Sequence, residues 1–184
     1  MNFSHISPDA NQRALGVRLF LMDVDGVMTD GRILLVPDGR GGVHEIKSFS
    51  VQDGVGINFA HRAGLLTGII TGRTSESVTA RAIELGIQIV EQGSRNKLET
   101  YEKVREASGI PDSQIAYIGD DLQDLPILHR TGLSASVANA RQQVMEACHL
   151  VTDSPGGAGA VRDCIEFILR TQGKWDPILA RYLA

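Results

Sequence analysis

The sequence predicts an α/β fold in which a parallel sheet lies between two layers of helices, in a three-layer, Rossmann-like arrangement. Three apolar runs, at residues 17–22, 65–70 and 114–118, each stop abruptly at polar or glycine residues. This pattern is typical of buried parallel strands that deliver loops to one edge of a sheet. Stretches with helical spacing separate the runs, and such alternation predicts parallel pairing through right-handed crossovers.

The composition of the 184-residue chain is that of an ordinary globular protein, with 42% hydrophobic and 22% charged residues. This length suits one domain, so we treat residues 1–184 as a single unit. A formal net charge of −4 argues against a nucleic-acid partner, which favours a basic face. A local cluster of cations with a metal ion still permits an anionic small-molecule substrate.

The N-terminal residues 1–16 lack the apolar stretch of a signal peptide, and we interpret them as a short lead-in or frayed arm. No apolar run approaches the ~20 residues that cross a bilayer. These features indicate a cytoplasmic protein without a membrane partner. Cys148 and Cys164 are the only cysteines, so neither a disulfide framework nor a zinc site is predicted.

The remaining elements follow the same alternation. Weaker strands are expected at residues 87–90 and 133–137. Apolar spacing predicts helices at residues 53–63, 75–85, 98–105, 122–130, 141–147 and 159–169. Residues 31–49 depart from this alternation of strands and helices. Their pattern predicts two strands joined by a turn at Pro37-Asp38-Gly39. We predict a β-hairpin there and no cap domain, since no other insertion is long enough.

The apolar side chains of this hairpin allow two interpretations. Ile33, Leu35 and Val43 would expose an apolar face in a monomer, which indicates self-association. Alternatively, these side chains cover their own sheet.

The loop after the first strand carries two carboxylates at alternating positions, Asp23 and Asp25. A carboxylate can attack a phosphoryl group in line and form an acyl phosphate that water hydrolyses. We predict Asp23 as this nucleophile. Asp25 would protonate the leaving alkoxide and later activate water. Gly26 lets the backbone turn closely around the bound phosphate.

A cation is needed where carboxylates meet an anionic substrate. Asp120, Asp121 and Asp124 follow the strand at residues 114–118. Mg²⁺ prefers oxygen ligands, with one or two carboxylates plus the substrate phosphate. We predict a Mg²⁺ site formed by Asp23, the backbone carbonyl of Asp25, and Asp120. Asp121 would bind it directly or through water, whereas Asp124 would orient its neighbours.

The phosphoryl oxygens also call for donors. Thr71 offers a hydroxyl, Gly72 a backbone N–H, and Lys97 an ammonium at a predicted helix start. Arg73 and Lys47 are candidates for binding the rest of the substrate, although isolated basic side chains are more often solvated or paired. Asp53 either faces the substrate or caps the helix at residues 53–63.

Together these motifs resemble, in order, those of the haloacid-dehalogenase superfamily: Asp23-Val24-Asp25-Gly26-Val27, Thr71, Lys97, and Gly119-Asp120-Asp121-Leu122-Gln123-Asp124. The resemblance implies the haloacid-dehalogenase fold and phosphoryl-transfer chemistry. The presence of Asp25 favours a phosphatase, because dehalogenases of this superfamily lack the second aspartate.

A closer resemblance, from Arg18 to Lys174, is to the capless 3-deoxy-D-manno-octulosonate 8-phosphate phosphatase family. It rests on the stretches Glu45-Ile46-Lys47-Ser48-Phe49, Asp53-Gly54-Val55-Gly56-Ile57, Ile70-Thr71-Gly72-Arg73, Gln92-Gly93 before Asn96-Lys97, and Gly156-Gly157-Ala158-Gly159-Ala160-Val161-Arg162. The resemblance implies Mg²⁺-dependent hydrolysis of that sugar phosphate in lipopolysaccharide biosynthesis. It also implies a homotetramer whose packed hairpins let a neighbour roof the site. Residues 154–184 would form a flap that closes over substrate, followed by a helix.

Two positions depart from the family pattern. Ala158 and Gln52 stand where the family commonly has Arg. A related substrate, such as a nonulosonate 9-phosphate, therefore stays open as an alternative. A second alternative is an accessory subunit of a larger complex that retains this fold.

Overall fold

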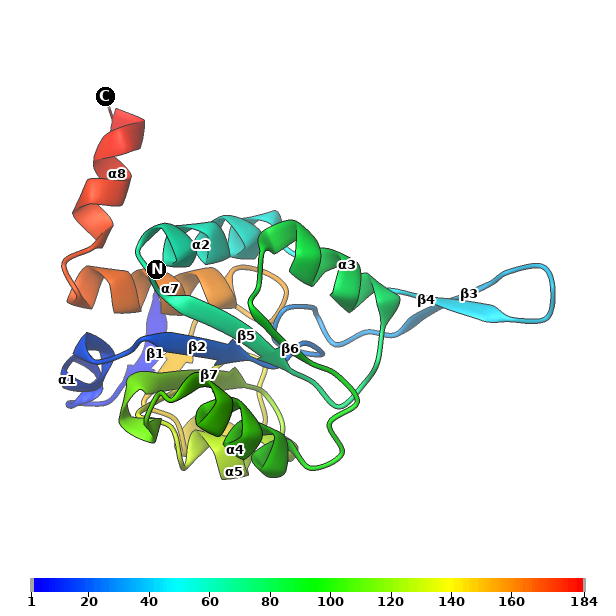
Figure 1. Cartoon of the computed structure of the whole chain (residues 1–184), viewed down its shortest axis with the longest axis horizontal. Coiled ribbons are helices and arrows are strands. Elements are labelled where there is room, and N and C mark those ends of the chain that lie inside the picture. Colours follow the sequence, from blue (N-terminus) through cyan, green and yellow to red (C-terminus); the bar gives the residue numbers. More distant parts are fainter. Residues whose placement is uncertain (1, 184) are drawn as a thin grey trace.

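The computed structural model describes residues 2–183 and is built around a seven-stranded sheet (Figure 1). The strands lie in the order β1-β9-β8-β7-β2-β5-β6. Their bounds are β1 (Phe3–Ile6), β2 (Leu19–Met22), β5 (Leu66–Ile70), β6 (Ile89–Glu91), β7 (Ile115–Gly119), β8 (Leu133–Ser136) and β9 (Leu150–Thr152). All neighbouring strands pair in parallel except β1, which runs antiparallel to β9. The predicted α/β class with a mostly parallel sheet is confirmed.

Helices cover both faces of this sheet. Their bounds are α1 (Ala10–Leu15), α2 (Val51–Arg62), α3 (Glu76–Leu85), α4 (Lys97–Ser108), α5 (Leu125–Leu128), α6 (Gln142–Glu146), α7 (Ala160–Thr171) and α8 (Trp175–Leu183). Helices α2 and α7 pack together on one face, with α4 and α5 on the other (Figure 1). Within residues 2–183, no helix is both long and apolar enough to cross a membrane.

The central strand β2 fixes where the site lies. Its four residues are completely buried, as expected for a strand covered on both faces. In the sheet, Met22 lies opposite Ile69 of β5 and Ile118 of β7. The three strands therefore end at the same level. The loops that follow them must meet at one edge of the sheet.

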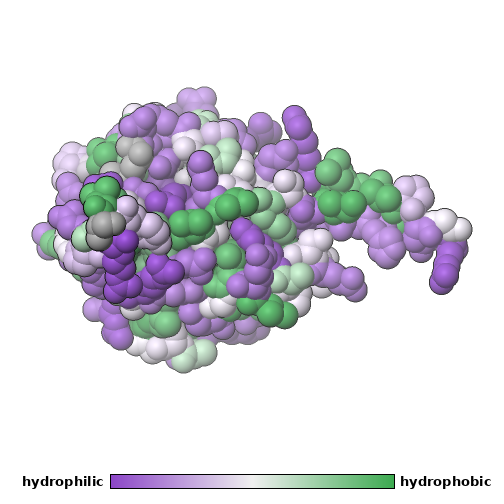
Figure 2. Space-filling model, turned by 90° about the horizontal axis from the view of Figure 1, so that it is seen from above, coloured by the Kyte–Doolittle hydropathy of each residue, from purple (hydrophilic) through white to green (hydrophobic). Residues whose placement is uncertain are grey.

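The predicted hairpin is present and projects from the body as a separate two-stranded sheet (Figure 1). Strand β3 (Leu34–Pro37) pairs antiparallel with β4 (Val43–Ile46). The turn between them is held by Asp38, whose Oδ1 accepts hydrogen bonds from the backbone of Arg40 at 2.7 Å and Gly42 at 2.8 Å. Apolar side chains gather on the projecting hairpin (Figure 2).

The prediction of a frayed arm at the N-terminus is wrong for the residues described. Strand β1 extends the sheet through pairing with β9, and α1 packs against α7. Both elements are too short for a strand or helix period of apolar residues to be recognised in the sequence. The helix expected at residues 122–130 is also divided, into a 3₁₀ turn at Leu122–Asp124 and the short α5.

Candidate active site

The carboxyl edge of the sheet brings together side chains that lie far apart in the sequence. Asp23 follows β2, Thr71 follows β5, and Asp120 follows β7. Asp23 is held in place by its backbone N–H, which donates to Ile118 at 3.1 Å. Thr71 is fixed on both sides, donating to Glu91 at 2.9 Å and accepting from Ser94 at 3.0 Å. The site therefore rests on rigid strand ends.

A buried ammonium joins two of the carboxylates. The Nζ of Lys97 lies 3.0 Å from Oδ1 of Asp23 and 2.7 Å from Oδ1 of Asp124. Lys97 begins α4, whose N-cap is Asn96, and its side chain is only 2% exposed. Burial alone would lower the pKa of Lys97, but Asp23 and Asp124 outweigh it and raise that pKa above its ordinary value. Lys97 therefore stays charged.

The carboxylates themselves are crowded. Burial raises the pKa of Asp23 to about 6, against the opposing effect of Lys97 and with a further contribution from Asp124. Burial also raises the pKa of Asp120 to about 7, aided by the charges of Asp23 and Asp124. One lysine is thus too little positive charge for three neighbouring carboxylates. The site favours an additional cation.

The donor set fits Mg²⁺. Carboxylate oxygens of Asp23, Asp120 and Asp124 lie within 4.8 Å of one another. The Oδ1 of Asp120 is buried and has no hydrogen-bond partner among the described residues. Gly26 has a φ of +96°, and a Cβ there would lie 2.1 Å from Oδ2 of Asp120. This glycine therefore leaves room for the Asp120 carboxylate. Hard cations such as Mg²⁺ bind oxygen ligands, and the unpaired Oδ1 of Asp120 beside the other carboxylates offers such a ligand.

Asp124 completes the cluster but is already saturated with donors. Its Oδ1 accepts from Lys97 and from the hydroxyl of Tyr117 at 2.6 Å. Its Oδ2 accepts from the backbone N–H groups of Asp120 at 3.1 Å and Asp121 at 3.2 Å. Four donors therefore surround the Asp124 carboxylate, which is consistent with the prediction that Asp124 orients its neighbours.

Sequence reasoning missed Tyr117. Its signal was a tyrosine in the middle of an otherwise apolar strand, where a buried hydroxyl needs a partner. Asp121 points elsewhere, because its side chain accepts from the N–H of Leu122 at 2.7 Å and caps the 3₁₀ turn. That contact gives Asp121 a local structural role, and its direct or water-mediated binding of Mg²⁺ stays a prediction.

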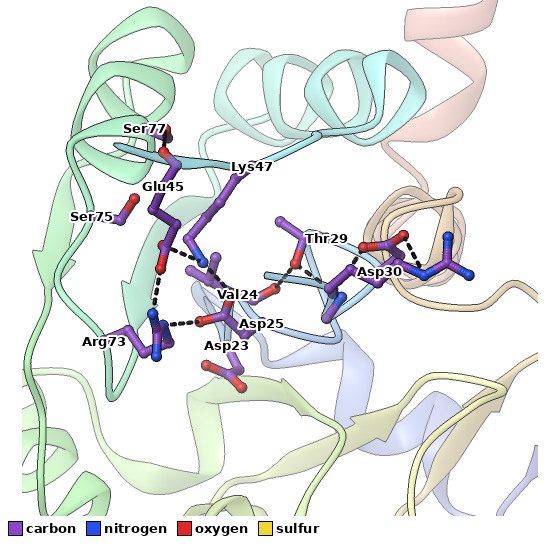
Figure 3. Close-up of polar contacts among 12 residues, drawn as sticks. Asp23, Val24, Asp25, Thr29, Asp30, Glu45, Lys47, Arg73, Ser75 and Ser77 are labelled. Carbon is purple, nitrogen blue, oxygen red and sulfur yellow. Dashed lines mark hydrogen bonds and ion pairs between the residues drawn. The ribbon is translucent and has the colours of Figure 1, made fainter. Parts of the chain in front are cut away.

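Asp25 lies in a second group of charges beside the first (Figure 3). Its Oδ1 forms a close ion pair with Nζ of Lys47, and its Oδ2 lies 3.9 Å from Nε of Arg73. Both cations also contact Glu45, which sequence reasoning did not single out. Lys47 and Arg73 therefore lie beside the catalytic loop, where the sequence predicts substrate-binding groups. The backbone of Gly72 follows Thr71 at the same edge.

The prediction that Asp53 caps α2 is wrong. The N-cap of α2 is Ser50, whose Oγ accepts from the N–H of Asp53 at 3.3 Å. The Asp53 carboxylate is buried and turns to the start of α7, accepting from the N–H of Gly159 at 3.3 Å and Arg162 at 2.9 Å. It therefore satisfies free N–H groups at the start of another helix, and a contact of Asp53 with substrate stays a prediction.

The glycine-rich segment before α7 packs on the catalytic loop. Gly156 donates to Oδ1 of Asn139 at 2.9 Å, and Gly157 donates to the carbonyl of Val27 at 2.8 Å. A Cβ on Gly156 would lie 1.7 Å from the carbonyl oxygen of Gly26, so no other residue fits there. The predicted flap thus lies directly against the loop that carries Asp23 and Asp25.

Comparison with known proteins places this geometry in a family. A haloacid dehalogenase-like hydrolase model matches residues 79–164. The 3-deoxy-D-manno-octulosonate 8-phosphate phosphatase of Salmonella typhimurium is 38% identical over 174 residues, which span 95% of this chain and 90% of the relative. The chain belongs to the 3-deoxy-D-manno-octulosonate 8-phosphate phosphatase family.

Solved structures of the family agree closely with this chain. The phosphatase from Moraxella catarrhalis, in complex with magnesium, phosphate and the sugar acid, is 39% identical with a TM-score of 0.91. It aligns over 95% of this chain and 98% of its own length. The phosphatase from Yersinia pestis is 38% identical with a TM-score of 0.88, over 95% and 96% of the two chains.

The hydroxyl of Tyr117 supports the metal cluster, so we expect Tyr117→Phe to weaken Mg²⁺ binding about tenfold. Without this hydroxyl, the Asp124 carboxylate is held less firmly. Asp124 in turn positions Lys97 and the backbone N–H of Asp120. The measurement is a titration of the Mg²⁺-dependent rise in melting temperature.

The matched control for this prediction is Tyr101→Phe. Tyr101 is also a buried tyrosine and donates to Asp112 at 2.6 Å, but away from the cluster. It should lower stability without changing the Mg²⁺ concentration required. Equal effects of the two substitutions on Mg²⁺ binding would contradict the role assigned to Tyr117.

Proposed function

We propose that this chain is a Mg²⁺-dependent phosphatase that hydrolyses 3-deoxy-D-manno-octulosonate 8-phosphate to the free sugar acid and phosphate. The observation that carries the proposal is the buried Asp23 carboxylate, which lies 3.0 Å from Lys97 at the same sheet edge as the unpaired oxygen of Asp120. Support for the substrate comes from relatives that carry this name, one of them in complex with magnesium, phosphate and the sugar acid.

In the first half-reaction, a carboxylate oxygen of Asp23 attacks phosphorus and the bond to the sugar oxygen breaks. Asp25 gives its proton to that departing oxygen. Its side chain is 21% exposed, so a substrate can reach it. Lys97, the hydroxyl of Thr71 and the N–H of Gly72 stabilise charge on the phosphoryl oxygens. The product of this step is an aspartyl phosphate on Asp23 together with the free sugar acid.

In the second half-reaction, the Asp25 carboxylate takes a proton from water as the water oxygen attacks phosphorus. The bond between phosphorus and Asp23 breaks, which releases phosphate and restores the Asp23 carboxylate. Asp25 ends this step protonated, ready for the next substrate, so acid and base duties alternate on one group. Asp23, the backbone carbonyl of Asp25 and Asp120 would hold Mg²⁺, which would neutralise negative charge on the phosphoryl group.

The quaternary structure is a further part of the proposal. Six apolar side chains of the hairpin segment are each at least 44% exposed: Ile33, Leu34, Leu35, Val36, Val43 and Ile46. A lone two-stranded sheet is marginal in water, and a patch of this kind marks an association surface (Figure 2). We assign it to a homotetramer in which hairpins pack together and a neighbour roofs the site. The cytoplasmic location stays a prediction.

The substrate is tested by measuring phosphate release from a panel of sugar phosphates in the presence of Mg²⁺. We expect a strong preference for 3-deoxy-D-manno-octulosonate 8-phosphate, reversible loss of activity on chelation, and no activity in an Asp23→Asn variant prepared identically. Preference for a nonulosonate 9-phosphate would instead support the alternative substrate that the departures at Ala158 and Gln52 leave open. Full activity without a divalent metal would contradict the proposed chemistry.

The association surface is tested by Leu35→Lys, which places a charge on the exposed hairpin face. Burying this ammonium without a partner is costly, so the tetramer should dissociate to smaller species. The measurement is the molar mass by light scattering after size exclusion. Ile83→Lys on α3 is the control, since Ile83 is 76% exposed but lies outside the hairpin. An unchanged mass for Leu35→Lys would remove the hairpin from the interface.

A further inference from the structure

The four charges beside the catalytic loop form a closed ring. Asp25 contacts Lys47, Lys47 lies 3.0 Å from Oε1 of Glu45, and Oε2 of Glu45 forms a close ion pair with Arg73. Arg73 completes the ring 3.9 Å from Asp25 (Figure 3). Two anions and two cations alternate around it. Glu45 is the member opposite Asp25, and among the described residues these two are the carboxylates that form ion pairs with both cations.

Glu45 is held firmly in this position. It is a residue of β4, and its backbone carbonyl accepts a hydrogen bond from Ser77 of α3 at 3.4 Å. Its side chain is 17% exposed, and that of Lys47 only 1%. The contacts with Arg73 and then Lys47 lower the pKa of Glu45, so its carboxylate is charged. Lys47 therefore has two counter-ions, Glu45 and Asp25.

The ring places the two cations differently around Asp25. Lys47 contacts Oδ1 directly, whereas Arg73 stays beyond hydrogen-bond distance of Oδ2. A guanidinium binds a carboxylate strongly. The Nη2 of Arg73 donates a close hydrogen bond to Glu45. Without Glu45, this nitrogen would be available to bind Asp25. The Oδ2 of Asp25 is consequently left free for proton transfer.

We infer that Glu45 is a positioning residue that keeps Arg73 off the Asp25 carboxylate while it holds Lys47 against it. The inference rests on the proposed phosphatase function, in which Asp25 donates and accepts the proton. In the proposed mechanism, Glu45 itself contacts neither the substrate nor the metal. Without its charge, Arg73 would pair with Oδ2 of Asp25, and that oxygen would no longer be available to the leaving group.

Steady-state kinetics of Glu45→Gln test this role. Blocking Oδ2 should lower kcat about tenfold or more, as a small displacement of a catalytic group does. KM should stay unchanged or fall, because the site loses a negative charge and the substrate is an anion. A purely structural role would instead lower the folded fraction or raise KM. Circular dichroism and molar mass check that the variant is folded and assembled.

A second variant makes the test specific. In Glu45→Gln/Arg73→Gln the guanidinium that blocks Asp25 is gone, so kcat should recover from the value of Glu45→Gln, even though KM rises. Further loss of kcat in the double variant would overturn the inference. If Glu45→Gln yields too little folded protein, Glu45→Asp replaces it in the test. The shorter side chain of aspartate cannot reach both cations. A wild-type kcat in Glu45→Asp would then overturn the inference.

The control is Glu99→Gln, which removes a carboxylate from a surface ion pair with Lys103 on α4 and should leave the kinetics unchanged. The outcomes separate the two proposals. Wild-type turnover together with an unchanged kcat in Glu45→Gln would overturn the inference alone. Absence of turnover in the wild type would contradict the proposed function and the inference with it.

Discussion

The buried ammonium of Lys97 is the contact on which the rest of the site depends. It lies between Asp23, at the end of the central strand, and Asp124, in the 3₁₀ turn that follows β7. Neither the lysine nor the carboxylates would tolerate burial alone, because each buried charge needs a partner. Their mutual pairing fixes the start of α4 against two strand ends. It also leaves the cluster short of positive charge, which explains why these residues suit a divalent cation.

The sequence predicts the strands around the site because their apolar runs end in polar residues. For the same reason Asp23, Thr71 and Asp120 were expected at one edge. The remaining features depend on contacts between distant segments, which no local pattern encodes. Asp53 turns to residues more than a hundred positions further along the chain. Glu45 meets Arg73 across 28 positions. Strands β1 and β9 are too short for periodicity to reveal, and only their pairing defines them.

The hairpin joins the proposed association surface to the charged residues at its root. Its outer part carries the exposed apolar side chains, whereas Glu45 lies in β4 and Lys47 directly follows that strand. A contact that moves the hairpin would therefore also move Glu45 and Lys47, which belong to the ring of charges around Asp25. On the other side of the catalytic loop, Gly156 and Gly157 pack against Gly26 and Val27. A chain without a cap domain thus confines its catalytic loop between the hairpin root and the glycine-rich segment.

The most direct test of this account is to capture the covalent intermediate on Asp23. The enzyme is mixed with 3-deoxy-D-manno-octulosonate 8-phosphate and Mg²⁺, quenched during turnover with borohydride, and digested for peptide mass spectrometry. Borohydride reduces an acyl phosphate to an alcohol, so we expect homoserine at position 23, dependent on both substrate and Mg²⁺. Turnover with Asp23 unmodified, or reduction of a different carboxylate, would contradict the assignment of Asp23 as the nucleophile.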